Sequence, residues 1–245
     1  TKLISLTHMS NVTGSITNFE KISQISKKNN IPLLIDGCQQ VAHCPINMND
    51  IGCDFYVFSG HKLYGPSGVG VLYMKDKWFE ELDPYQGGGS MIDKVEIDQT
   101  EYARGYEKFE AGTPPIVQVI GLGSSYDFLN NYDLNKIFNY EKELYNYTFE
   151  KLNTLDGVTI YGQSDKKGAI LTFNIKNIHT NDIAMVLDQH NIAIRTGHHC
   201  AQPLMKKLNT DFTARVSFGI YNDKKDVDCF IDAIKETKKF FDGYN

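Results

Sequence analysis

The first 75 residues limit the fold most, because short apolar runs alternate there with a helical segment and polar turns. Within residues 17–29, Phe19, Ile22 and Ile25 are spaced as on one face of a helix. Four near-continuous apolar runs lie around it: Leu3 to Thr7, Pro32 to Asp36, Asp54 to Ser59 and Gly70 to Met74. Such runs are typical of strands in a parallel sheet, so this half predicts an α/β fold with a mostly parallel sheet covered on both faces.

The second half has a different pattern of elements. A long helical region follows Pro115 as far as about Leu155, with an interruption near residues 130–133. Strands are predicted at 158–161, 169–174, 192–195 and 214–220, and helices at 180–189, with Thr180 as the N-cap, and at 224–241. The pattern indicates a smaller α+β domain.

The domain organisation follows from these two patterns. Residues 1–115 are predicted to form part of a large cofactor-binding domain, and residues 116–245 a connecting helix with a small C-terminal domain. Residues 84–114 are glycine-rich and only weakly periodic, which predicts a long functional loop. Because Thr1 already starts a buried strand, we expect that residues of the domain precede it.

Composition excludes some classes of function. The net charge is −5 and the basic residues are scattered, which argues against a nucleic-acid partner. No apolar stretch approaches the about 20 residues that a membrane-spanning helix needs, and we expect no signal peptide. Five cysteines without a framework spacing favour free thiols and a reducing compartment.

Polar groups follow two of the predicted strands at the point where each ends. Asp36 ends one strand with Gln39 three residues later, and Ser59, His61 and Lys62 follow the next strand. Taken alone, Asp36 fits a turn-capping aspartate equally well, and a lysine in a glycine-rich turn is more often structural. Together they fit pyridoxal phosphate, whose aldehyde needs an amine and whose ring nitrogen needs an acid.

Cys200 lies in a polar Gly-His-His turn and is the candidate nucleophile. Histidines 198 and 199 can both carry positive charge, which would lower the pKa of a neighbouring thiol. Two other interpretations of this turn are possible. A zinc site is disfavoured, because the side chains of adjacent residues diverge, and the second alternative is a buried, inert cysteine. The remaining cysteines are interpreted as structural: Cys38, Cys44, Cys53 and Cys229.

Five motifs in order carry a family resemblance. They are His8-Met9-Ser10-Asn11-Val12, Asp36-Gly37-Cys38-Gln39, the run from Phe58 to Pro66, the run from Phe109 to Pro114, and the run from Arg195 to Ala201. In these motifs the chain resembles the group II cysteine desulfurases of the SUF iron–sulfur assembly system over essentially its whole length. The resemblance implies the type I aminotransferase fold. We expect no metal in the site.

The same resemblance implies a role for each matching residue. Lys62 would form the Schiff base with the cofactor, and Cys200 would be the nucleophile. The other cofactor-binding residues would be Asp36, Gln39, Ser59, His61 and Thr113, and the substrate carboxylate would meet Asn11, Arg215 and Arg195. Thr113 would reach into the site of a second subunit, which implies a homodimer, and Gly87 to Met91 match the loop that crosses the dimer interface.

The implied activity is conversion of L-cysteine to L-alanine with a persulfide left on Cys200. A sulfur-acceptor protein of the SUF system would collect that sulfur for iron–sulfur cluster assembly. Two alternatives stay open: selenocysteine lyase activity on the same scaffold, and an inactive fragment or non-catalytic binding protein of this fold. The resemblance places the ring-stacking histidine and part of the phosphate cup before residue 1, and the expected location is a bacterial cytoplasm or, as the alternative, a plastid.

Overall fold

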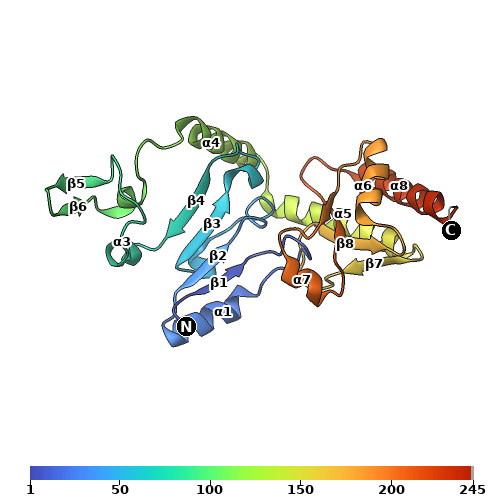
Figure 1. Cartoon of the computed structure of the whole chain (residues 1–245), viewed down its shortest axis with the longest axis horizontal. Coiled ribbons are helices and arrows are strands. Elements are labelled where there is room, and N and C mark those ends of the chain that lie inside the picture. The colour runs from blue at the N-terminus through green and yellow to red at the C-terminus, as the bar shows by residue number, and fades with distance from the viewer. Residues whose placement is uncertain (244–245) are drawn as a thin grey trace. The chain divides into compact units, whose positions relative to one another are not determined.

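The computed structural model describes residues 1–243, and the chain divides into two compact units (Figure 1). Unit 1 contains residues 1–8 and 18–132, and unit 2 contains residues 9–17 and those from 133 onward. These units do not have the same boundaries as the domains predicted from the sequence. The predicted domain boundary at residue 115 stays a prediction. None of the helices among residues 1–243 has the length and apolarity needed to cross a membrane.

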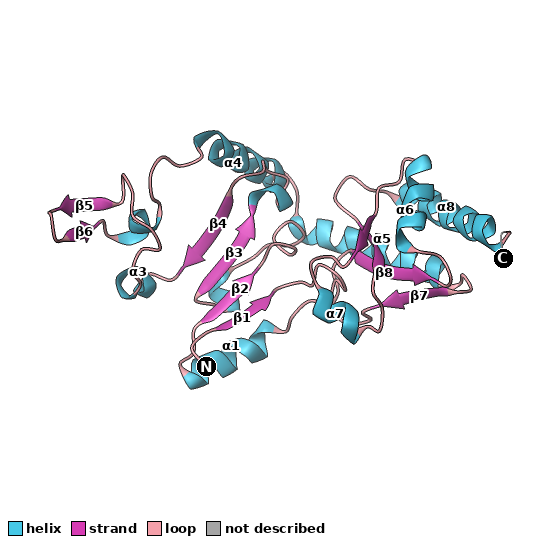
Figure 2. Ribbon diagram, in the orientation of Figure 1, coloured by secondary structure: helices cyan, strands magenta, loops and turns pink. Residues whose placement is uncertain are grey.

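Unit 1 is built on a four-stranded sheet of order β1-β2-β3-β4 (Figure 2). Its strands are β1 (Ile4–Thr7), β2 (Leu33–Asp36), β3 (Phe55–Ser59) and β4 (Gly70–Met74). The first three strands are parallel and β4 pairs antiparallel with β3. The predicted strands and the mostly parallel sheet are therefore confirmed.

Helix α1 (Phe19–Asn29) covers one face of this sheet. Phe19 packs with the buried side chains of Leu33, Ile35 and Tyr56. Apolar burial of this kind stabilises by about 25 cal/mol per Å² removed from water. On the other face Leu72 is 50% exposed, so the covering of both faces that the sequence predicts is wrong for the residues that the structure describes.

The remaining elements of unit 1 are short except for one helix. They are α2 (Met48–Ile51), the 3₁₀ turn η1 (Gly60–Lys62), α3 (Lys77–Glu81), β5 (Ile92–Val95), β6 (Thr100–Tyr102), the 3₁₀ turn η2 (Gly105–Phe109) and α4 (Ile116–Asn130). Strands β5 and β6 form an antiparallel hairpin inside residues 84–114, where the sequence predicted a long functional loop. The sequence did not reveal this hairpin for two reasons. The segment is rich in glycine, and the strands carry mostly exposed polar side chains.

Unit 2 is an antiparallel sheet of order β7-β8-β10-β9 with helices, as expected of a smaller α+β domain. Its elements are α5 (Leu134–Asn153), β7 (Val158–Tyr161), β8 (Ile170–Ile175), α6 (Thr180–Gln189), β9 (Arg195–Gly197), α7 (Gln202–Lys207), β10 (Thr213–Ser217) and α8 (Lys224–Asp242). The predicted N-cap is wrong: the Nδ1 atom of His179, not Thr180, accepts the amide hydrogen of Asn181 at 3.2 Å.

The core of unit 2 lies between one face of the sheet and three helices. Apolar side chains from α5, α6 and α8 pack there on those of β8 and β10, among them Leu144, Phe173, Ile183, Ala214 and Phe230. The opposite face of β8 is contacted by the segment 9–17, because the Thr172 hydroxyl donates to the carbonyl of Val12. This segment is held further by a hydrogen bond from Gly168 N to Gly14 O at 2.9 Å.

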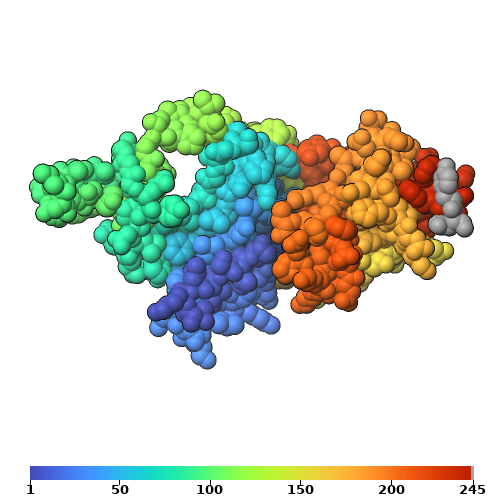
Figure 3. Space-filling view, in the orientation of Figure 1, coloured from blue at the N-terminus to red at the C-terminus, as the bar shows by residue number. Residues whose placement is uncertain are grey.

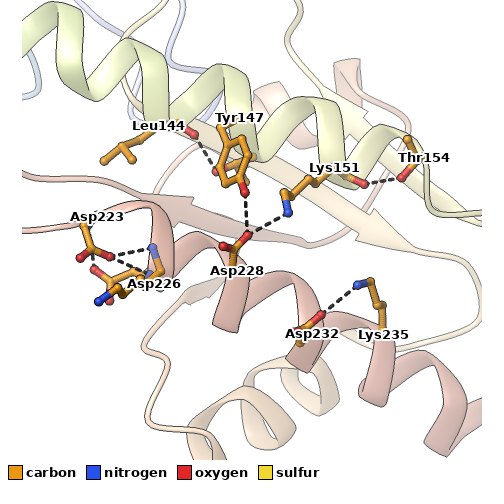
Figure 4. A network of polar contacts seen from close by, with 11 residues as sticks. Leu144, Tyr147, Lys151, Thr154, Asp223, Asp226, Asp228, Asp232 and Lys235 are labelled. Atoms are coloured by element: carbon orange, nitrogen blue, oxygen red, sulfur yellow. Dashed lines mark hydrogen bonds and ion pairs between the residues drawn. The ribbon is translucent and has the colours of Figure 1, made fainter.

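Polar contacts fasten α8 to α5 at the surface of unit 2 (Figure 4). Tyr147 Oη and Lys151 Nζ both lie 2.8 Å from Asp228 Oδ1. Asp223 caps α8, and its carboxylate accepts from the backbone amides of Lys225 and Asp226. Because ion pairs that water can reach contribute little to stability, we expect these contacts to fix the orientation of α8 more than to stabilise the fold.

Candidate active site

In unit 1 the polar residues predicted from the sequence lie at one edge of the sheet. Asp36 is the last residue of β2, Ser59 is the last of β3, and Lys62 ends the 3₁₀ turn that follows β3. Because β2 and β3 are parallel, their carboxyl ends share an edge. Asp36 pairs with Val57, two residues before Ser59, so Asp36 and Ser59 also share a face of the sheet.

The backbone around Asp36 fixes this carboxylate. The amide of His8 donates to the carbonyl of Asp36 at 2.7 Å, and the amide of Cys38 donates to its Oδ1 at 2.9 Å. Gly37 follows, and a Cβ atom there would lie 2.1 Å from ring atoms of the fully buried Tyr56. Only glycine therefore allows the chain to turn directly after Asp36.

Lys62 is presented by a tight turn between two glycines. The carbonyl of Gly60 accepts from the amides of Leu63 at 2.9 Å and of Gly65 at 3.1 Å. A Cβ on Gly65 would approach that same carbonyl oxygen to 2.9 Å, so the turn requires glycine there. The Lys62 side chain is exposed. Its amine is thus accessible to a reacting carbonyl group.

The other predicted residues of unit 1 surround this edge to different degrees. Ser59 Oγ lies 3.6 Å from Cys38 Sγ, and Gln39 is half-buried in the turn after Asp36, while His61 is exposed beside Lys62. Thr113 lines a pocket of about 760 Å³ with Gln86 and the start of α4. The residues lining that pocket include neither Asp36 nor Lys62, so Thr113 is not brought into the same group.

Sequence reasoning assigned no role to a buried pair behind Asp36. His8, directly after β1, places Nδ1 3.0 Å from Tyr56 Oη, and both side chains are buried. Burial lowers the pKa of His8 to about 4 and raises the pKa of Tyr56 well above its usual range, so both are neutral at pH 7. The position of His8 at a strand end, like that of Asp36, was the signal that could have found it.

Unit 2 places two arginines side by side. Arg215 on β10 and Arg195 on β9 are directly opposite in the antiparallel pair. Like charges in this position repel each other unless an anion lies between them. Arg215 Nη1 donates to the carbonyl of Asn11 at 2.7 Å, but its buried Nε has no hydrogen-bond partner among residues 1–243. Burial and, second, the charge of Arg195 lower the pKa of Arg215. The pair is suited to bind a carboxylate.

Cys200 is exposed next to this arginine pair. Arg195 Nη2 lies 3.5 Å from Cys200 Sγ. His199 and Cys200 both have left-handed backbones, with φ of 53° and 59°. Non-glycine residues hold this conformation only when their surroundings enforce it, and such residues cluster at active sites.

The source of positive charge near Cys200 differs from the expected one. Burial, followed by the charge of Arg215, lowers the pKa of His199 to about 4. His199 is therefore neutral at pH 7, and the expectation that both histidines charge the thiol is wrong for this one. The guanidinium of Arg195 supplies the cation instead.

The two histidines do not converge on Cys200 as metal ligands would. The ring of His198 packs on that of Phe212 at 4.8 Å between centroids, whereas His199 Nε2 lies 3.0 Å from both Thr213 O and Thr213 Oγ1. Among residues 1–243 there is no group of three His, Cys, Asp or Glu side chains that could hold a metal ion. Each side chain thus has a structural partner of its own.

Solved structures resemble the chain closely. The crystal structure of the cysteine desulfurase CsdA (S-sulfonic acid) from Escherichia coli matches with a TM-score of 0.94 and 34% identity, covering 98% of this chain and 59% of that one. The apo structure of a cysteine desulfurase from Thermococcus onnurineus matches with a TM-score of 0.93 and 36% identity, over 96% of this chain and 59% of that one. The predicted aminotransferase-type fold is confirmed by these matches.

Curated relatives give the same result. A protein named probable cysteine desulfurase from Halalkalibacterium halodurans is 44% identical over 241 residues, which are 98% of this chain and 59% of that protein. One of the same name from Staphylococcus epidermidis is 44% identical over 242 residues. The chain thus spans about 59% of the length of the curated relatives it matches. The model of the aminotransferase class-V family matches residues 1–230, and the chain belongs to that family.

Proposed function

We propose that the protein containing this chain is a pyridoxal-phosphate-dependent cysteine desulfurase, which converts L-cysteine to L-alanine and keeps the sulfur on Cys200. The observation that carries the proposal is the exposed Cys200 thiol beside the opposed Arg195–Arg215 pair. A carboxylate receptor next to a sulfur nucleophile suits an amino acid that carries sulfur. Similar proteins are named probable cysteine desulfurase, which supports the same activity.

The residues of unit 1 fit the cofactor. An exposed amine, a carboxylate at a neighbouring strand end and a hydroxyl are the groups that a phosphorylated pyridine aldehyde needs. Lys62 would hold the aldehyde carbon and Asp36 the ring nitrogen, while Gln39 would donate to the ring oxygen and Ser59 and His61 to the phosphate. Bound there, pyridoxal phosphate supplies an electron-accepting ring that weakens the bonds around the α-carbon of an amino acid.

The side chains of this chain then divide the reaction. Arg215, with Arg195 beside it, clamps the carboxylate and so sets the orientation of the α-carbon. The Lys62 amine would take the α-proton and later return a proton to carbon. The Cys200 thiolate attacks the substrate sulfur, so that a sulfur–sulfur bond forms as the carbon–sulfur bond breaks. The electron pair of the broken bond remains on carbon, which is protonated to give alanine.

The test is alanine release from L-cysteine by the full-length protein supplied with pyridoxal phosphate. We expect turnover in the wild type and none in Cys200→Ser, because a hydroxyl does not accept the sulfur. Equal turnover in both would contradict the proposal. Selenocysteine separates the alternative activity: a selenocysteine lyase releases alanine from it in Cys200→Ser as well, because selenium leaves without attack by the thiol.

The surface of unit 1 supports a homodimer. Helix α4 is mostly apolar, yet Val117 is 78% and Ile120 66% exposed, and α4 lies at the surface in the space-filling view (Figure 3). The pocket containing Thr113 borders the same helix. We infer that a second copy covers α4 and receives Thr113. Sedimentation of the full-length protein tests this: a dimer that Val117→Glu dissociates is expected, and a monomeric wild type would contradict it.

The fate of the sulfur follows from the exposure of Cys200. An exposed thiol on a short turn can be reached by a docking protein. We therefore propose a sulfur-acceptor protein of the SUF system as the partner and iron–sulfur cluster assembly as the purpose. The proposed location is a reducing compartment. We propose a bacterial cytoplasm, with a plastid as the alternative.

A further inference from the structure

His199 lies at the centre of a set of contacts around the nucleophile. It is 2% exposed, although the neighbouring Cys200 is exposed. Its Nε2 atom is 3.0 Å from both the carbonyl and the hydroxyl oxygen of Thr213 on β10. A ring packed this closely has little freedom to move.

The partners of the ring identify its tautomer. A carbonyl oxygen only accepts hydrogen bonds, so Nε2 must carry the hydrogen that points to Thr213. The hydroxyl of Thr213 is itself directed to Met205 Sδ at 3.8 Å, which leaves its oxygen free to accept from the same Nε2–H. His199 therefore acts as a hydrogen-bond donor that ties its turn to β10.

The same residue connects the nucleophile to the carboxylate receptor. The side-chain amide of Asn11 donates to the carbonyl of His199 at 2.6 Å, and the carbonyl of Asn11 accepts from Arg215 Nη1 at 2.7 Å. Thr213 and Arg215 are two residues apart on β10, so they share a face. The contacts form a closed ring from His199 through Thr213, the strand, Arg215 and Asn11 back to His199.

We propose that His199 is a positioning residue, which through Thr213 and Asn11 holds the Cys200 turn in its left-handed conformation with the thiol beside Arg195. The inference deepens the proposed function, because it names what places the nucleophile. Without this hydrogen bond, we expect the backbones of His199 and Cys200 to leave the left-handed conformation, because extended backbone has a lower energy for non-glycine residues. The sulfur of Cys200 would then move away from the positive charge of the Arg195 guanidinium, which lies 3.5 Å from it in the structure.

The test measures the reactivity of the thiol and needs no turnover. The full-length protein is treated with iodoacetamide, and the rate of alkylation is followed for the peptide containing Cys200. Cys229 is exposed on α8 and serves as the control thiol within the same molecule. Because no substrate is added, the result does not depend on whether the protein is a desulfurase.

His199→Leu removes the donor at similar volume, and His199→Gln keeps a donor near the position of Nε2. We expect alkylation of Cys200 to be roughly 3- to 10-fold slower in His199→Leu, to return to within about 2-fold of the wild type in His199→Gln, and to stay unchanged at Cys229. Equal rates at Cys200 in all three proteins, or equal losses in both variants, would overturn the proposal.

Thr213→Val provides a second route should His199→Leu not fold. It removes the hydroxyl and keeps the backbone acceptor, so a smaller decrease at Cys200 is expected. Thr213→Ser, which retains the hydroxyl, should match the wild type. Wild-type reactivity in Thr213→Val together with a slow Thr213→Ser would again contradict the role of His199.

Discussion

The sheet edge of unit 1 and the nucleophile turn of unit 2 hold their reactive groups in different ways. At the sheet edge, Asp36 and Lys62 are exposed and are placed by the backbone next to them. In the turn, Cys200 is placed by contacts between distant parts of the chain, since Asn11 and His199 are 188 residues apart. The sheet edge can therefore be inferred from local sequence, whereas the turn depends on the folded unit.

The comparison predicts the largest effect for the exposed amine of unit 1. Lys62→Ala should lower alanine formation by the full-length protein by about 10³-fold or more, because the proton carrier and the group that holds the cofactor are lost together. The fold should remain, since the side chain is exposed. Lys2→Ala, another exposed lysine of unit 1, is the control and should keep wild-type turnover. Turnover in Lys62→Ala equal to that of the wild type would show that the Lys62 amine of unit 1 takes no part in the reaction.

In unit 2 the largest kinetic effect after that of Cys200 is expected from Arg215→Lys. A lysine cannot reproduce the forked hydrogen bonds to a carboxylate, and the loss of about 1.5–3 kcal/mol corresponds to roughly a 10- to 100-fold higher KM for cysteine. Arg195→Lys, at an exposed position, should raise KM less. An unchanged KM in Arg215→Lys would show that this half-buried arginine does not bind the carboxylate.

Each unit buries one neutral histidine, so acid should destabilise both. Burial lowers the pKa of His8 and of His199 to about 4, below the 6.5 of an unfolded histidine. Between these values the unfolded state binds more protons, so stability is complete above pH 6.5, falls as the pH decreases towards 4, and loses at most about 3 kcal/mol per ring.

Urea unfolding between pH 4 and 7 measures this loss. His8→Gln and His199→Gln should each reduce it, because each substitution removes one of the two buried rings. If neither of the buried substitutions changes the slope with pH, the rings are not held neutral as the structure indicates.

A smaller effect on stability is expected when Gly37 of unit 1 and Gly197 of unit 2 are each replaced by alanine. Gly37→Ala places a methyl group against the immobile ring of Tyr56 and should lower the free energy of unfolding by about 1–3 kcal/mol. Gly197→Ala meets open space, so only its φ of 112° opposes it, at about 1 kcal/mol. Unfolding in urea measures both free energies of unfolding. A larger decrease for Gly197→Ala than for Gly37→Ala would contradict the difference in space that the structure shows around the two glycines.

Local pattern predicted much of the fold and part of the site. The strand ends that carry Asp36 and Ser59 and the helices α5, α6 and α8 follow from apolar periodicity. The β5–β6 hairpin was missed because its side chains are mostly exposed and the apolar residues of β5, Ile92 and Val95, do not alternate regularly with polar ones. The neutrality of His199 was also missed, because it depends on burial against Thr213, which lies on β10.

The chemistry proposed for both units depends on Cys200 receiving the sulfur of cysteine. The direct measurement is the mass of the Cys200 peptide after brief mixing of the full-length, pyridoxal-phosphate-loaded protein with L-cysteine. We predict a gain of one sulfur atom on Cys200, none on Cys229, and none on Cys200 in Lys62→Ala. Alanine formed without any sulfur on Cys200, or sulfur gained equally by Cys229, would contradict the account.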